Sequence, residues 1–380
     1  MIQVVALLAA FAVGIIFAAV GALKLKLAKM LNIDNAKVGG LISALMLTMM
    51  CLVLFIGPMV DAYGHKFFAV AGSIIVFLGF FMLISAKSYR TAVFACIIMG
   101  IGATFLTTIG NVLMTVVLFG GENEPAALSL GNSFFGLGAF FTPFVVAILL
   151  KKLGYKITGK FIAIILLLPI IFALFANYPD VKIGFQISQA FALLTEGIVI
   201  FSALALFCYV GLENAMGGWV SSYASGLGFS DRSSNFVLSS YWICLMLGRL
   251  IAAGFGIKAL VGPEIGITVS IVLSIAAIIV IGILAVTKLK IVGTIGIVLM
   301  GLIFGPLYPT VLGVALADPV VKPIVGSGFG IIFAIGLLGA STIPIAMGIY
   351  SKGRTVQQSF KIAIAAAVVM LVMIIIMGQF

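Results

Sequence analysis

The chain has 380 residues, of which 64% are hydrophobic and 8% are charged, and its formal net charge is +11. About a quarter of the residues of a soluble domain are charged, so this composition excludes a soluble globular fold and indicates an integral membrane protein. The four cysteines lie inside apolar runs at irregular spacing, which argues against a disulfide framework or a metal site. We expect no metal and no cofactor.

Twelve apolar segments follow one another along the chain, each close to the roughly 20 residues that a helix needs to cross a bilayer core of about 30 Å. They lie near residues 2–23, 38–60, 67–86, 92–119, 126–150, 160–177, 198–226, 234–256, 264–287, 291–316, 324–349 and 356–378. The first segment has no basic start and no small-residue cleavage site, so we interpret it as a helix and not as a signal peptide. The sequence therefore predicts an all-α membrane protein with twelve transmembrane helices.

Short matches recur between the two halves of the chain. At an offset of 201 residues, Met99-Gly100 matches Met300-Gly301, and Gly138-Ala139 matches Gly339-Ala340. Six helices followed by six in the same order predict a parallel repeat about an axis along the membrane normal. We expect an N-terminal six-helix bundle over 1–177, a connection over 178–189 and a C-terminal six-helix bundle over 190–380.

The stretch GPMVDAYGHK, residues 57–66, joins the second and third apolar segments. It resembles the Gly-x-x-x-Asp-x-x-Gly-Arg-Lys loop of the major facilitator superfamily, with His65 where that family usually has arginine. The residues in register are Gly57, Asp61, Gly64 and Lys66. Glycine permits the tight turn, and the acidic group can cap or pair with a helix end. The resemblance implies a cytoplasmic latch that stabilises an outward-open form; the alternative is an ordinary polar turn.

Further local features resemble the fucose permease-type sugar:proton symporters. They are LGNSFFGLGAFFTP (130–143), YVGLENAMGGWVSSY (209–223), LGRL (247–250) and GPLYPT (305–310), together with Asn111. The chain departs from that branch because its first segment has no acidic residue and its fourth carries the neutral Asn111. The resemblance implies transport of a small solute by alternating access, and no enzymatic reaction.

Two ionisable residues lie clearly inside apolar segments, Glu213 in the seventh and Arg249 in the eighth. Such residues are costly within a membrane and are functional candidates for that reason. A proton carrier must be neutral in one step and charged in another, and a desolvated carboxyl group can be both. We therefore predict proton coupling at Glu213. The alternative is a permanent charge held by Arg249, which itself is expected to act as a latch.

Amide and aromatic side chains form the predicted substrate site. Amides both donate and accept hydrogen bonds, and aromatic rings cover the apolar side of a sugar, so the combination suits a neutral polyhydroxy solute. The predicted residues are Asn111, Asn132, Glu213, Asn214, Trp219, Tyr223, Trp242 and Tyr308. Asn235, Trp242 and Arg249 follow one another at seven-residue spacing and are predicted to share a helix face. Neighbouring serines and threonines are assigned to helix packing.

Two other functions stay open. The 31 phenylalanines and the lack of a second intramembrane acid favour an exporter of amphiphilic drugs or lipids, and a non-transporting membrane receptor belongs to a different class. We expect a monomer in the lipid bilayer that binds a small molecule and protons, and no nucleic acid.

The expected location is a bacterial inner membrane with both termini in the cytoplasm. The charges conflict with this orientation, because fifteen of the 21 basic residues lie in the odd-numbered connections, which the positive-inside rule would place in the cytoplasm.

Overall fold

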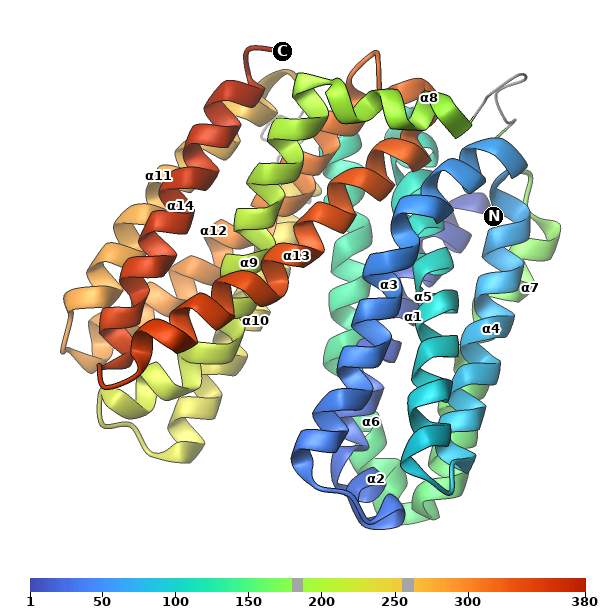
Figure 1. Ribbon diagram of the computed structural model, residues 1–380, viewed down its shortest axis with the longest axis horizontal. Helices are drawn as coiled ribbons and strands as arrows, with labels where there is room; N and C mark the ends of the chain where they lie inside the picture. Colours follow the sequence, from blue (N-terminus) through green and yellow to red (C-terminus); the bar gives the residue numbers. More distant parts are fainter. Residues whose placement is uncertain (180–186, 255–262) are drawn as a thin grey trace. The chain divides into compact units, whose positions relative to one another are not determined.

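The computed structural model describes residues 1–179, 187–254 and 263–380, and within these ranges every regular element is a helix (Figure 1). In this part of the chain, 11 helical stretches are long and apolar enough to cross a membrane. The prediction of an all-helical, multi-pass membrane protein is confirmed. A single helical stretch, Glu124–Phe175, covers the predicted segment 126–150 and all but the last two residues of the predicted segment 160–177.

The chain divides into two compact units. Unit 1 consists of Met1–Leu118, Phe134–Ala190 and Ile324–Gly330, and unit 2 consists of Phe119–Ser133, Phe191–Pro323 and Ile331–Phe380. The predicted connection over 178–189 lies partly outside the described residues, which leave out 180–186. The predicted bundle boundaries stay a prediction.

Unit 1 is built from the first helices of the chain. They are α1 (Ile2–Ala22), α2 (Lys24–Leu31), α3 (Asn35–Tyr63), α4 (His65–Ser85), α5 (Tyr89–Val117), most of α6 (Glu124–Ile165) and α7 (Leu168–Phe175). Polar residues in the breaks start these helices: the Asp34 carboxylate accepts from the Lys37 N–H at 2.7 Å, and Ser88 forms a capping box with Thr91. Such caps satisfy N–H groups that have no partner within the helix.

Helix α6 leaves helical geometry at Gly154, where φ is +73°. A residue with a β-carbon resists this conformation, which glycine adopts readily. The break lies between the two apolar segments that the sequence analysis separated.

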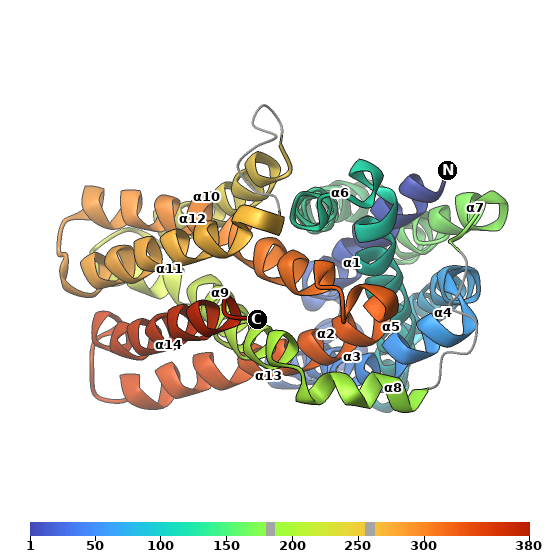
Figure 2. The ribbon, with the colours of Figure 1, turned by 90° about the horizontal axis from the view of Figure 1, so that it is seen from above.

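The core of unit 1 is one hydrophobic cluster that includes Leu27 of α2, Leu41 of α3 and Ile84 of α4. Helix α4 packs on α5 and α7 (Figure 2). Helices α1 and α6 touch through backbone, because a Cβ atom at Gly14 would collide with the Phe135 carbonyl and one at Gly138 with the Phe11 carbonyl. Small residues allow this close approach between membrane helices.

Unit 2 contains the later helices. The short helix α8 (Ile187–Ala192) begins in unit 1 and ends in unit 2. It is followed in unit 2 by α9 (Gly197–Gly226), α10 (Asp231–Ala252), α11 (Pro263–Val286), α12 (Lys290–Ala317), most of α13 (Val325–Ser351) and α14 (Val356–Met377). Close packing recurs here, because a Cβ atom at Gly339 of α13 would collide with the Phe207 carbonyl of α9, and one at Gly248 of α10 would lie 2.5 Å from the Leu302 carbonyl oxygen of α12. Helix α10 packs on α12, and α9 packs on both of them.

Candidate functional site

The two intramembrane charges form one ion pair in unit 2. Arg249 Nη2 of α10 donates to Glu213 Oε1 of α9 at 2.9 Å, and the two side chains are 8% and 15% exposed. Desolvation of two charges offsets much of their attraction, so a buried pair is weak evidence for stability. Arg249 Nε is buried without a hydrogen-bond partner among the described residues. The guanidinium therefore keeps a free donor beside the pair.

Three buried tyrosines surround this pair. Tyr209 donates to the Phe304 carbonyl of α12 at 2.8 Å, and Tyr241 donates to the Glu213 carbonyl at 3.3 Å. The Tyr308 ring lies 5.9 Å from that of Tyr209. The sequence analysis named Tyr308 but missed Tyr209 and Tyr241. The four-residue spacing from Tyr209 to Glu213 was a usable signal, since residues four apart share a helix face.

Helices α9 and α10 meet along a line of three contacts. Besides the ion pair, Ser221 donates to the Asn235 amide oxygen at 3.0 Å. Gly217 makes room for the Trp242 indole, since a Cβ atom at Gly217 would lie 2.5 Å from that ring. The expectation that Asn235, Trp242 and Arg249 share a face is confirmed. That face of α10 lies against α9.

The three candidate asparagines make the same local hydrogen bond. The amide nitrogens of Asn111, Asn132 and Asn214 each donate at 2.8 Å to the carbonyl one turn earlier. The amide oxygen of Asn111 is buried without a partner among the described residues, and such groups in a native structure call for an explanation. Asn111 belongs to unit 1, whereas Asn132 and Asn214 belong to unit 2, and their shared role in binding solute stays a prediction.

The aromatic candidates differ in exposure. Trp242 is 43% exposed, and Trp219 lies partly buried near Gly348 of α13. Tyr223 is 1% exposed, and its ring packs at 5.3 Å from that of Phe360 of α14. Tyr223 is thus packed in the core of unit 2, and its assignment to the solute site stays a prediction.

The stretch 57–66 provides a second polar site, within unit 1. The Asp61 carboxylate accepts from the Gly326 N–H at 3.0 Å, the Ser327 N–H at 2.7 Å and the Ser327 hydroxyl at 2.6 Å. These N–H groups belong to the first turn of α13, where a helix has donors without internal partners and favours negative charge. Asp61 therefore caps a helix more than 200 residues away, which an ordinary polar turn does not do.

The glycines of this stretch explain its shape. A Cβ atom at Gly57 would collide with the Gly326 carbonyl, and Gly64 has a φ of +86°. His65 is buried at the start of α4, whereas Lys66 is exposed. The shape and contacts of this stretch thus depend on Gly57, Asp61 and Gly64. Lys66 is exposed beside them and takes no part in these contacts.

The sequence analysis missed a second acidic residue at a helix start. Lys322 Nζ lies 2.8 Å from Glu124 Oε1 in the first turn of α6, and the Glu124 side chain is 3% exposed. Gly313 of α12 packs against Pro125, which helps to bury the carboxylate. Glu124 lies between the predicted segments 92–119 and 126–150, where the hydropathy pattern predicts no helix.

The fold is similar to those of known transporters. FucP in its outward conformation superposes with a TM-score of 0.81 at 18% identity, over 99% of this chain and 98% of FucP. A variant of the Escherichia coli fucose:proton symporter FucP gives 0.78 at 18% identity over 100% of both chains. The proton:xylose symporter XylE gives 0.75 at 14% identity, over 100% of this chain and 95% of XylE.

Curated relatives match part of the chain. Protein TsgA of Salmonella arizonae is 29% identical over 180 residues, which are 45% of this chain and 46% of TsgA; TsgA of Salmonella typhi is 28% identical over the same shares. The chain spans about half the length of the curated relatives it matches. The family model of the Major Facilitator Superfamily matches residues 5–344, and the chain therefore belongs to that superfamily.

Proposed function

We propose that the protein transports a small neutral polar solute, most simply a sugar, in symport with protons and by alternating access. The fold is like those of FucP and XylE, which are named fucose:proton and proton:xylose symporters. The observation that carries the proposal is the buried ion pair between Glu213 and Arg249. Glu213 lies in a helical stretch that is long and apolar enough to cross a membrane, which supports it as the carboxyl group that takes up the proton.

The ion pair offers a physical link between proton and solute. When Glu213 takes up a proton, Arg249 becomes an uncompensated buried cation, which is costly in a low dielectric. Solute hydroxyl groups that accept hydrogen bonds from the guanidinium reduce that cost. Binding of the proton to Glu213 then raises the affinity of the protein for the solute, and binding of the solute raises the affinity for the proton by the same factor, as thermodynamic linkage requires. The Nε donor of Arg249, which is buried without a partner among the described residues, is the group that would make such a contact once the transporter opens to the solute.

Twelve transmembrane helices in two six-helix halves are part of the proposal. The break at Gly154 supports counting Glu124–Phe175 as two crossings. The glycine contacts of α1 with α6 and of α9 with α13 recur at corresponding places in the chain, as a parallel repeat requires. Asp61 then serves as a latch that is broken and remade during the cycle.

We further propose a monomer in a bacterial inner membrane with both termini in the cytoplasm. The family-like stretch 57–66 supports this orientation against the charge distribution. Site-directed labelling of single cysteines in intact cells tests it. Reagent that does not cross the membrane should reach a cysteine at Lys352 and should not reach one at Lys66; the reverse pattern inverts the orientation.

Uptake by proteoliposomes tests the function. Labelled neutral sugars are offered to purified protein with and without an inward proton gradient, and gradient-dependent accumulation of one sugar is expected. The Glu213→Gln variant should lose this accumulation and keep exchange of the same sugar across the membrane. If no sugar is taken up under either condition, the solute is of another class. If Glu213→Gln accumulates sugar as well as the unchanged protein, Glu213 does not couple protons.

A further inference from the structure

One end of unit 1 carries a dense set of exposed basic side chains, which we call the basic rim. Its nine members are Lys26, Lys29, Lys37, Lys87, Arg90, Lys151, Lys152, Lys156 and Lys160. None of them forms an ion pair with a residue that the structure describes. The one acid in these connections, Asp34, is engaged in capping α3. The rim is therefore a surface with a large uncompensated positive charge.

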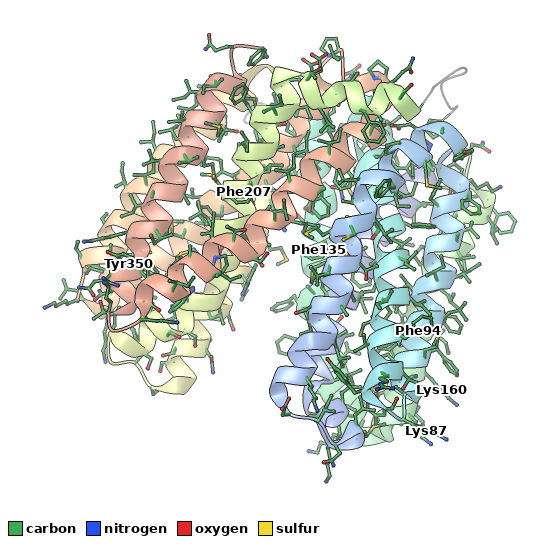
Figure 3. The ribbon with its side chains drawn as sticks, in the orientation of Figure 1. Lys87, Phe94, Phe135, Lys160, Phe207 and Tyr350 are labelled. Carbon is green, nitrogen blue, oxygen red and sulfur yellow. The ribbon has the colours of Figure 1, made fainter. Side chains whose placement is uncertain are left out.

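Packing of the core holds the rim together. Leu27, Leu41 and Ile84 join α2, α3 and α4 in one cluster, against which Tyr89 and Tyr155 pack. A Cβ atom at Gly159 would lie 2.6 Å from Ile84, so the helical stretch after Gly154 lies on the last turn of α4. Figure 3 shows the result, with Lys87 and Lys160 close together near this end of unit 1. The charges are thus fixed at one end of the unit by buried contacts.

Large apolar side chains are exposed beside these charges. Phe94 is 56% exposed and lies one turn after Arg90 (Figure 3). After Gly154, Ile157 and Phe161 are 54% and 45% exposed, and each directly follows a lysine of the rim. Lysine stems lie along apolar surface while their charged ends reach polar surroundings. Charged groups that can bind phosphate and apolar groups that can bind hydrocarbon chains are therefore next to each other on this surface.

We propose that the basic rim binds anionic phospholipids. The lysines and Arg90 hold the headgroup phosphate, and Phe94, Ile157 and Phe161 contact the acyl chains. Clusters of lysine and arginine at the ends of membrane helices attract anionic headgroups, and each charge adds to the affinity. A free phosphate ion uses only the charged part of this surface. The exposed apolar residues therefore favour a lipid, and the inference does not depend on which solute is transported.

Native mass spectrometry of the detergent-solubilised protein tests the proposal. The full chain is titrated with phosphatidylglycerol or phosphatidylcholine, and bound lipids are counted. We expect retention of phosphatidylglycerol in preference to phosphatidylcholine. The Lys156→Gln/Lys160→Gln variant should bind phosphatidylglycerol about 30-fold more weakly. The matched control is Lys288→Gln/Lys352→Gln, which removes two exposed lysines of unit 2 and should bind as the unchanged protein does.

A second variant tests whether weaker binding comes from loss of charge and not from a disturbed helix after Gly154. Lys87→Gln/Arg90→Gln removes two charges from the turn between α4 and α5 and should weaken binding by a similar factor. Equal retention of both lipids by the unchanged protein would overturn the proposal, as would equal weakening in the control. Competition by inorganic phosphate at the same concentration as phosphatidylglycerol would also overturn it, because the site would then bind a free anion without using its apolar residues.

Discussion

The same kind of helix crossing occurs once in each unit. In unit 1, Gly138 of α6 packs on the Phe11 carbonyl of α1, and in unit 2, Gly339 of α13 packs on the Phe207 carbonyl of α9. The two crossings differ in what lies beside them. The sequence offset of 201 residues aligns Ala12, which is 2% exposed, with Glu213, which pairs with Arg249. Unit 1 thus packs without a charge where unit 2 holds one.

This difference indicates why the charged pair is present. Close packing of glycines against backbone is sufficient for either crossing, and a buried ion pair contributes little net stability. The pair is therefore better explained by function than by folding. Two kinds of substitution distinguish a functional from a structural role of the pair. One replaces the ion pair of unit 2 by apolar residues as in unit 1, and the other weakens the glycine packing that both units share.

The largest effect is expected from removing one charge of the pair. Arg249→Leu leaves the Glu213 carboxylate buried without its cation, which should lower the free energy of unfolding by about 3–5 kcal/mol. Glu213→Ala/Arg249→Leu gives unit 2 an apolar site like that of Ala12 and should recover most of this loss. Thermal unfolding in detergent measures both. A double variant as unstable as the single one would mean that the pair holds α9 and α10 together.

The shared packing should respond similarly in both units. Gly138→Ala and Gly339→Ala each push a methyl group into a backbone carbonyl, and overpacking of this kind costs about 1–3 kcal/mol. Gly21→Ala in α1 and Gly282→Ala in α11 are matched controls, because a Cβ atom at either position meets nothing within 4 Å. The controls should unfold at or slightly above the temperature of the unchanged protein. A loss in only one unit would break the equivalence of the two crossings.

The Asp61 cap should show an intermediate effect. Asp61→Ala removes an acceptor from two N–H groups and one hydroxyl, so we expect a loss of about 1–3 kcal/mol in unfolding free energy. Lys66→Gln, at an exposed neighbouring side chain, should change it by less than about 0.5 kcal/mol. Equal effects of the two variants would reduce the stretch 57–66 to a polar turn.

Hydropathy and spacing predicted the helices well and the contacts between them poorly. The seventh segment, predicted over 198–226, is α9 over Gly197–Gly226. Helix α2 was missed because its lysines interrupt the apolar pattern. Glu213 and Arg249 were both found as isolated intramembrane charges, and a pair between them was the stated alternative to proton coupling. Whether they meet depends on the antiparallel register of α9 and α10. That register is determined by contacts such as that of Gly217 with Trp242, which have no signature in a single sequence.

The smallest effect is expected at the far end of this register. Ser221→Ala removes the hydrogen bond to Asn235, and because both side chains are partly or fully exposed, water replaces the lost donor. The free energy of unfolding should fall by about 0.5–1.5 kcal/mol at most, the net contribution of one hydrogen bond, and we expect the lower end of that range. Gly217→Ala, which pushes a methyl group against the Trp242 ring, should cost more and should also reduce solute accumulation, because it separates α9 from α10 near the ion pair. If Ser221→Ala impaired accumulation as much as Gly217→Ala, the whole line of contacts, and not the ion pair alone, would be needed for coupling.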